Sequence, residues 1–225
     1  MTKKVIVVSR MILLLINIFA LSSCLSIRPA VFSEQCAAPC WRNIKPGETH
    51  FQDAVDLIKK FPDLDFKNMA IGYPGNIFSD GIVFRLINGD EIRIYAIDSI
   101  VALIDYYSVK GITFQECIKV FGEPEFAVQY SKLGPGGLPF APSSSQHIWF
   151  TALSTSRGTA LTYETENSFD LNTGTEISIF SYFDIELFDE LYKSNILISF
   201  DPLEEVPQDK LHAWKGYGDI RELYP

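Results

Sequence analysis

The sequence predicts an α+β fold in which two approximate repeats, each a helix followed by antiparallel strands, form one domain behind a lipidated tether. Three observations lead to this fold class. Two short segments have the apolar spacing of an amphipathic helix, and runs with the composition of strands follow each of them. The third is the hydrophobic content of 47%, which leaves enough apolar side chains for a real core in a chain of 225 residues.

Each predicted helix carries apolar residues at its first, fourth, fifth and eighth positions, which together make one helical face. These residues are Phe51, Ala54, Val55 and Ile58 in the first helix, and Phe114, Cys117, Ile118 and Phe121 in the second. We expect all four apolar residues of the second helix to be buried. Lys119 lies about 100° around the helix from Ile118 and should therefore face solvent.

The two helices also share signals at their ends. Thr49 precedes Gln52 at the spacing of a capping box, and Thr113 precedes Glu116 in the same way. The threonines are one residue out of register when the helices are aligned, so the repeat is approximate. We expect the second helix to end at Gly122, because glycine adopts the left-handed conformation at little cost.

The strand-like runs follow the helices in two groups. After the first helix they cover residues 82–87, 91–97 and 100–106, and after the second they cover 126–130, 147–153, 160–165 and 176–183. A short helix at 185–192, capped by Asp184, and a strand at 196–200 are expected to follow.

The hairpin around residues 87–89 can close in two ways. Its Asn-Gly pair suggests a two-residue turn, which would place Phe84 opposite Arg93 and mix apolar and charged residues on one face. A three-residue loop with Gly89 in the left-handed conformation places Phe84 opposite Ile92 instead. We predict the longer loop, because a slip of one residue moves every side chain to the other face.

The first 23 residues have the organisation of a secretory signal. Residues 1–10 include three basic residues and no acid, residues 11–21 are almost all apolar, and small residues follow. A permanent transmembrane helix is the alternative. An apolar stretch of eleven residues reaches only about half of the ~30 Å hydrocarbon core. Extending it backwards would bury Arg10 at a cost of about 2.5–3.5 kcal/mol.

Residues 21–24 read Leu-Ser-Ser-Cys and resemble the bacterial lipobox. In that family the cysteine thiol receives a diacylglyceryl group, the signal is cut off, and the cysteine becomes the new N-terminus. The resemblance implies an extracytoplasmic protein that is bound to a membrane through lipid on Cys24, since two or more acyl chains give a stable anchor. An ordinary signal cut nearby is the alternative.

The charge of the chain excludes one class of partner. The formal charge is −9 for the whole sequence, and removing Lys3, Lys4 and Arg10 with the signal leaves 16 basic residues against 28 acidic ones, a charge of −12. Such a surface repels phosphate backbones, so we do not expect nucleic-acid binding.

The sequence contains four cysteines, of which lipidation would use Cys24. An exported chain meets an oxidising compartment, where disulfides persist. We favour a structural disulfide between Cys36 and Cys40, with Cys117 as a buried free thiol, and a bridge between Cys40 and Cys117 is its rival. Three residues separate Cys36 from Cys40, whereas active dithiols have two between them.

We expect five segments along the chain: a signal peptide at 1–23, a lipidated tether at 24–39, the first repeat at 40–110, the second at 111–200, and a C-terminal tail at 201–225. Trp214 and Tyr217 in the tail are candidates for a docking patch, because Trp and Tyr favour interfaces. The alternative is that the tail packs back on the domain.

Residues 39–49 read PCWRNIKPGET, which looks like the opening of a set of uncharacterised bacterial lipoproteins. The order Gly-x-Thr, helix, Gly-x-Pro also resembles a wider group, which includes the small lipoprotein of the outer-membrane β-barrel assembly machine and the tandem-repeat β-lactamase inhibitory proteins. The resemblance covers roughly residues 39 to 183. It implies helices packed on a short antiparallel sheet, and a role in binding proteins. The first half departs from the pattern, because residues 61–63 read Phe-Pro-Asp in place of Gly-x-Pro.

No catalytic, metal or cofactor motif stands out. The three histidines, His50, His147 and His212, lie far apart and in no ligand spacing. We therefore expect a non-catalytic module, not an enzyme, that binds an unknown protein partner or associates with the envelope. The alternative is a surface lipoprotein that binds a small ligand or a glycan, in a cleft lined by aromatic residues such as Trp149, Tyr163 and Tyr182.

Overall fold

The structure is a computed structural model, and it describes residues 36–72, 77–133, 146–165, 168–194, 196–197 and 210–225. All of them belong to the unit that spans Val31–Pro225. The expected signal segment and Cys24 lie outside the described residues. Within those residues, no helix is both long enough and apolar enough to span a bilayer.

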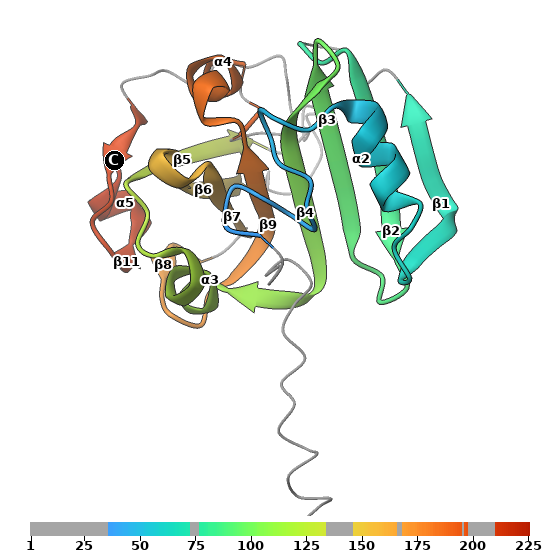
Figure 1. Cartoon of the computed structure of the whole chain (residues 1–225). Helices are drawn as coiled ribbons and strands as arrows, with labels where there is room; N and C mark the ends of the chain where they lie inside the picture. Colours follow the sequence, from blue (N-terminus) through green and yellow to red (C-terminus); the bar gives the residue numbers. More distant parts are fainter. Residues whose placement is uncertain (1–35, 73–76, 134–145, 166–167, 195, 198–209) are drawn as a thin grey trace, which may run out of the picture. The chain divides into compact units, whose positions relative to one another are not determined.

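Nine strands form one antiparallel sheet in the order β1-β2-β3-β4-β9-β7-β6-β5-β10 (Figure 1). They are β1 (Leu64–Gly72), β2 (Asp80–Leu86), β3 (Glu91–Ile97), β4 (Ile100–Thr113), β5 (Phe126–Leu133), β6 (Gln146–Ser154), β7 (Thr159–Thr165), β9 (Glu176–Phe183) and β10 (His212–Ala213). A second, two-stranded sheet joins β8 (Asp170–Leu171) to β11 (Gly218–Asp219).

The helices are few and short. They are α2 (Phe51–Ile58), α3 (Phe114–Phe121), α4 (Phe188–Lys193) and α5 (Ile220–Leu223), with 3-10 turns η1 (Thr155–Arg157) and η2 (Ile185–Leu187). Strands account for 47% of the described residues, so the fold is an open antiparallel sheet and is richer in β-structure than the expected helix-then-strand α+β repeat.

Strand β1 accounts for part of this difference, because no strand was expected between the first helix and residue 82. Most of its residues are exposed, so its sequence lacks the alternation of apolar and polar residues that marks a half-buried strand. Its pairing with β2 makes the two halves alike. Each half now has a helix followed by four strands of the large sheet, with β4 of the first half paired to β9 of the second, and the second half also contains α4.

The apolar face of α2 is buried as predicted. In α3 only Phe114 and Cys117 are buried, while Ile118 and Phe121 are partly exposed, so the expectation of four buried residues is wrong for two of them. Figure 1 shows α3 at the end of β4, where the helix follows the strand directly. Lys119 is exposed as predicted.

The predicted capping box of α3 is confirmed. The Thr113 hydroxyl accepts the Glu116 N–H at 3.3 Å, and the Glu116 carboxylate accepts the Thr113 N–H at 2.8 Å. The predicted box at Thr49 is wrong, because α2 starts after His50 and has no side-chain cap. Thr49 is engaged elsewhere, since its hydroxyl accepts the Lys45 N–H and its carbonyl accepts an N–H of β4.

The hairpin between β2 and β3 has the predicted three-residue loop. Phe84 lies opposite Ile92, and Arg85 lies opposite Glu91. Gly89 has a φ of 95°, the positive value that the loop requires.

The chain after β9 follows the expectation for a helix but not for the final strand. Asp184 caps the turn by accepting the Glu186 N–H at 3.0 Å, and the helix continues through α4. Ile196 and Leu197 lie in a turn, and residues 198–200 are outside the described part. The Ile196 N–H bonds the Leu191 carbonyl at 3.1 Å, which turns the chain back towards α4 instead of extending it.

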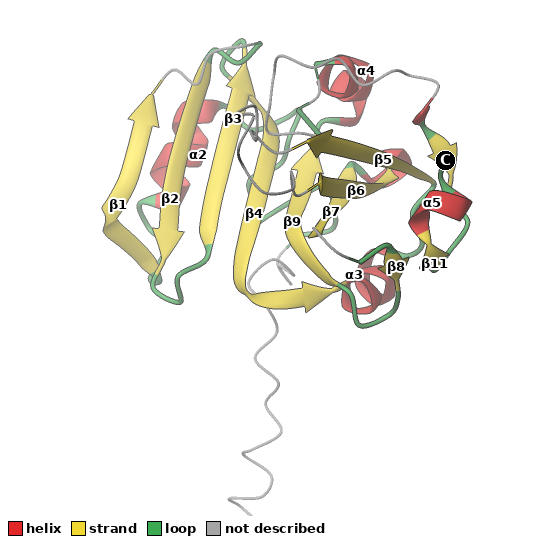
Figure 2. Cartoon of the chain, turned by 180° about the vertical axis from the view of Figure 1, so that it is seen from behind, coloured by secondary structure: helices red, strands yellow, loops and turns green. Residues whose placement is uncertain are grey.

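Apolar groups bury parts of both faces of the sheet. Helix α2 covers one face of β2 to β4, as Figures 1 and 2 show from opposite sides. On the other face, Leu191 and Tyr192 of α4 pack with Leu103, Leu153 and Phe183 at one end of the sheet. Away from α4, no helix among the described residues lies over the face of β2 to β4 that is opposite α2 (Figure 2).

Candidate functional site

A row of charged and aromatic side chains lies on the face of β2 to β4 that points away from α2. Residues directly opposite each other on antiparallel strands share a face. Arg85 lies opposite Glu91, Glu91 opposite Tyr107, and Arg93 opposite Asp105. We call these five residues the charged row.

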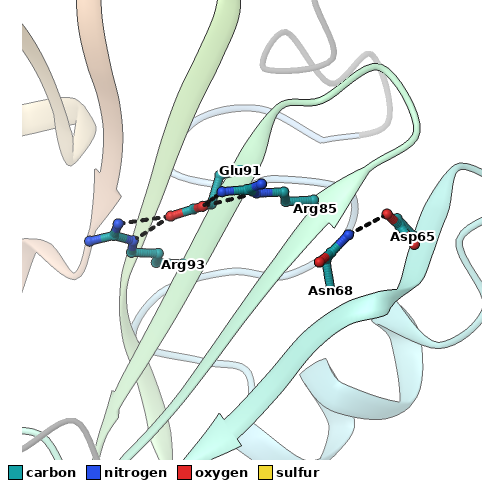
Figure 3. Close-up of polar contacts among 5 residues, drawn as sticks. All are labelled: Asp65, Asn68, Arg85, Glu91 and Arg93. Atoms are coloured by element: carbon teal, nitrogen blue, oxygen red, sulfur yellow. Dashed lines mark hydrogen bonds and ion pairs between the residues drawn. The ribbon is translucent and has the colours of Figure 1, made fainter.

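Glu91 joins the two arginines of the row (Figure 3). Its carboxylate accepts a hydrogen bond from Arg85 Nη2 at 3.0 Å and from Arg93 Nη2 at 2.8 Å. Burial acts to raise the pKa of Glu91, but the hydrogen bonds from Arg93 and Arg85 lower it below its ordinary value. The side chain of Arg85 is 55% exposed and that of Arg93 is 30% exposed, so both guanidinium groups remain accessible.

Asp105 sits deeper in the row. The Ser181 hydroxyl donates a hydrogen bond to its Oδ1 at 2.7 Å. Burial nevertheless raises the pKa of Asp105 to about 6, against the lowering effects of the Ser181 hydrogen bond and the Arg93 charge. Arg93 also lies over the ring of Tyr107, with 4.5 Å from Cζ to the ring centroid. The row therefore combines an ordered cation, an aromatic face and a carboxyl group that titrates near neutral pH.

The edge strand β1 carries two exposed apolar residues, of which Ile71 lies opposite Ile82 and therefore on the face that α2 covers. Phe66 and Ile71 are 59% and 54% exposed. Asp65 shapes a bulge in this strand, because its Oδ1 accepts the Lys67 N–H at 3.1 Å and its Oδ2 accepts a hydrogen bond from Asn68 at 2.6 Å (Figure 3). Within the described residues β1 pairs only with β2, whereas β10 pairs with β5 at the opposite end of the sheet.

A polar pocket of about 460 Å³ is the second candidate site. It lies where the far part of β4 meets β7, β8 and the start of β9. Its wall consists mainly of hydroxyl, amide and carboxylate side chains together with one aromatic ring: Ser108, Gly111, Tyr163, Glu164, Ser168, Asp170, Asn172, Thr175, Glu176, Ile177 and Ser178.

The cysteines pair as favoured from the sequence. Cys36 and Cys40 form a disulfide with their Cα atoms 5.7 Å apart, and Cys117 is a free, buried thiol. The rival bridge between Cys40 and Cys117 is therefore wrong. Burial raises the pKa of the Cys117 thiol above its ordinary value, which makes the group unreactive.

The tail residues Trp214 and Tyr217 lie side by side, with their ring centroids 6.1 Å apart. Trp214 is half-buried, and its ring stacks on Phe114 of α3 at a centroid distance of 6.5 Å. The backbone N–H of Trp214 donates to the Glu125 carbonyl at 2.9 Å, so the tail packs back on the domain at this point. Tyr217 is the more exposed of the two.

The three aromatic residues expected to line a cleft do not come together. Tyr182 is fully buried, with its ring 4.7 Å from that of Phe180. Tyr163 lies opposite Phe150 and lines the polar pocket. Trp149 precedes Phe150 on β6 and therefore points to the other face of the sheet.

The sequence reasoning placed Arg93 and Glu91 on strands but did not assign them a site. The predicted three-residue hairpin loop already placed Arg85 opposite Glu91, and this pairing could have indicated the site. Asp105 had a weaker signal, a lone carboxylate in the apolar run IVALIDYY of β4. No local pattern shows that β9 would bring Ser181 to it. Among the described residues, no group of three or more His, Cys, Asp and Glu side chains is arranged to hold a metal ion.

Comparisons of the chain with protein-family models, with curated proteins and with solved structures gave no match.

Proposed function

We propose that the chain is an exported bacterial lipoprotein, held on the outer side of a membrane by lipid on Cys24, whose domain binds another envelope protein without catalysing a reaction. The charged row carries the binding role. It places two partly exposed arginine side chains and an aromatic ring on the part of the sheet face, away from α4, that no described helix covers (Figure 2).

The anchor rests on the order of sequence features at the N-terminus. A basic segment, eleven mostly apolar residues and small residues precede Cys24 in the arrangement of a lipoprotein signal. Lipid on this residue would tether the domain through residues 24–39 and leave the sheet free to meet a partner. The net negative charge of the mature chain fits a solvated surface outside the membrane.

The side chains of the row are of the types that dominate protein interfaces. Arg and Tyr are enriched among the residues that contribute most to binding energy. Glu91 holds Arg85 and Arg93 in place before any partner arrives, so less side-chain entropy is lost on binding.

The absence of catalysis is also part of the proposal. Asp105 is the group of the row that titrates near neutral pH, and it is bonded to a serine on an adjacent strand and faces an arginine. That serine, Ser181, is only 4% exposed, so its hydroxyl is not open to a substrate as a nucleophile.

We also propose that the two halves arose by duplication. In support, the strands of the first half, β1 to β4, stand in mirrored order to β5, β6, β7 and β9 about the central β4–β9 pair. Tandem repeats of this kind occur in the protein-binding group that the sequence resembles. In an experimental structure, placing β4 on β9 should bring α2 onto α3, and failure of that superposition would refute the duplication.

Photo-cross-linking in living cells tests the binding role. A photoreactive amino acid at Val83, which lies opposite Arg93 on the face of the charged row, should form an adduct with one recurring protein. The same amino acid at Lys59, exposed just after α2, is the matched control and should not form that adduct.

Charge reversal at the row completes the test. Arg85→Glu should abolish the adduct from Val83 while leaving the amount of folded protein unchanged, because Arg85 is exposed. Equal adducts from Val83 and Lys59, or adduct formation that survives Arg85→Glu, would show that the charged row is not the binding surface.

A further inference from the structure

The polar pocket combines the size and the position of a ligand site. Its volume of about 460 Å³ falls within the range of about 300–1,000 Å³ that is usual for pockets holding small molecules. Its wall is built from segments far apart in the sequence, with Ser108 and Gly111 from β4, Tyr163 from β7 and Ser178 from β9.

Hydrogen bonds hold the wall of the pocket in place. The Glu164 N–H donates to the Ser178 hydroxyl at 3.1 Å, and the Asn172 N–H donates to the Thr175 hydroxyl at 2.9 Å. Strand β8 is further tied to the tail through β11. The polar groups of the wall therefore have defined positions before any ligand enters.

Gly111 shapes one side of the pocket. Its φ of +66° is unfavourable for other residues, and a Cβ at this position would lie 2.3 Å from Glu176 Oε2. The absence of a side chain lets the Glu176 carboxylate lie against the backbone of β4. Glu176 and Ser108 both line the pocket.

The lining determines the charge that a ligand can carry. Glu164, Asp170 and Glu176 line the pocket, and no lysine, arginine or histidine stands among the described lining residues. Against these described side chains an anionic ligand would meet like charge, and a purely apolar ligand would bury polar groups without hydrogen bonds. The ligand must therefore be neutral or cationic and rich in hydrogen-bonding groups.

We propose that this pocket binds a sugar ring that is either uncharged or carries an amine. Carboxylate and amide side chains accept and donate the hydrogen bonds that neighbouring sugar hydroxyls require. The ring of Tyr163 supplies an apolar face on which the C–H side of a pyranose can pack. The described lining shares no residue with the charged row, although Ser108 and Gly111 lie on β4, as Asp105 and Tyr107 do.

Titration calorimetry on the full-length protein, in a detergent without a sugar headgroup, tests the proposal. The probes are chitotriose, a neutral oligosaccharide, glucosamine, which carries an amine, and glucuronic acid, which carries a carboxylate. We expect saturable binding of chitotriose or glucosamine, and binding of glucuronic acid at least about tenfold weaker because of the carboxylates in the wall.

Two variants locate the binding to the pocket. Tyr163→Ala and Glu176→Gln should each weaken binding by about tenfold or more, since each removes a contact without emptying the core. Glu186→Gln, which changes an exposed carboxylate outside the pocket, is the matched control and should bind as the parent does. Arg85→Glu should also leave sugar binding unchanged, which separates this site from the charged row.

The proposal is wrong if neither chitotriose nor glucosamine binds, or if glucuronic acid binds best. It is equally wrong if Tyr163→Ala and Glu176→Gln bind as tightly as Glu186→Gln does. Thermal unfolding of each variant shows whether it is folded, and a variant that has lost its unfolding transition is replaced by Ser178→Ala, which removes one hydroxyl from the same wall.

Discussion

Asp105 and Arg93 lie directly opposite each other on β4 and β3, yet the carboxyl group does not have the low pKa typical of a carboxylate beside a guanidinium. Burial raises the pKa of Asp105 to about 6 and outweighs both the Ser181 hydrogen bond and the Arg93 charge. The guanidinium of Arg93 is instead hydrogen-bonded to Glu91. The stability of the folded protein should therefore depend on whether Asp105 is protonated, and this state changes at a pH of about 6.

The first prediction concerns the pH dependence of stability. The pKa of Asp105 is higher in the folded chain than its ordinary value of 3.8, so the folded state favours the protonated form. Its contribution is fully present below about pH 4 and is lost as the pH rises through about 6. Asp105→Asn stays neutral at every pH. Urea unfolding should therefore find this variant more stable than the parent by roughly 1–3 kcal/mol at pH 8 and nearly equal to it at pH 4.

Ser181→Ala provides the control for this prediction. Removing the hydroxyl takes away a hydrogen bond that favours the ionised carboxyl group, so the pH-dependent loss of stability should become larger. If Asp105→Asn has the same pH profile as the parent, Asp105 is not the group responsible.

The second prediction concerns an ion pair that ties the N-terminal part of the domain to the segment after α2. Nη1 and Nη2 of Arg42 each donate a hydrogen bond of 2.6 Å to the Asp63 carboxylate, and Arg42 also lies over the rings of Trp41 and Phe61. The hydrogen bond from Arg42 lowers the pKa of Asp63. Because Asp63 is partly exposed, Arg42→Ala should cost only about 1 kcal/mol in chemical unfolding.

Lys45→Ala is the matched change for that pair. Lys45 and Glu48 are both exposed, so this substitution should alter stability by less than about 0.5 kcal/mol. Equal costs for Arg42→Ala and Lys45→Ala would mean that the paired geometry of Arg42 has no special effect.

The third prediction concerns α3. Phe114 is fully buried, so Phe114→Ala should destabilise the protein by roughly 3–5 kcal/mol. Ile118 is partly exposed, and truncating it to alanine should cost clearly less. Lys119→Ala should stay within about 0.5 kcal/mol. Denaturant unfolding of the three variants checks this order, and a larger loss for Ile118→Ala than for Phe114→Ala would contradict the packing of the helix.

The fourth prediction concerns the cysteines. Peptide mapping without reduction should recover Cys36 joined to Cys40. Cys117 should react with an alkylating agent only after unfolding, since its thiol is buried and its pKa is raised. Rapid alkylation of Cys117 in the native protein would show that α3 does not cover it.

The fifth prediction concerns the anchor. Cys24→Ala removes the only thiol that the lipobox offers, so the protein should lose incorporation of labelled fatty acid and leave the membrane fraction. Fractionation followed by an alkali wash measures this. A Cys24→Ala protein that stays in the membrane after the wash would mean that the first 23 residues are a retained helix.

The sequence by itself determined the features whose causes are local. The capping box of Thr113 and Glu116 spans about one helical turn, and its two partners are only three positions apart in the sequence. The hairpin register followed from keeping Phe84 and Ile92 on one face. The Cys36–Cys40 disulfide closes a loop of a few residues and was favoured on the same ground.

Only the tertiary structure decided the features that join distant segments. The Thr49 hydroxyl accepts the Lys45 N–H and the Thr49 carbonyl accepts an N–H of β4. Thr49 therefore does not cap α2, although its spacing to Gln52 fits a capping box. Strand β1 has no apolar alternation because it is an exposed edge, and only pairing with β2 makes it a strand. The pKa of Asp105 depends on how closely β3 and β9 pack beside β4. The physical reason is common to all three, since desolvation and strand pairing depend on neighbours in space, and the spacing of residues along the chain does not record them.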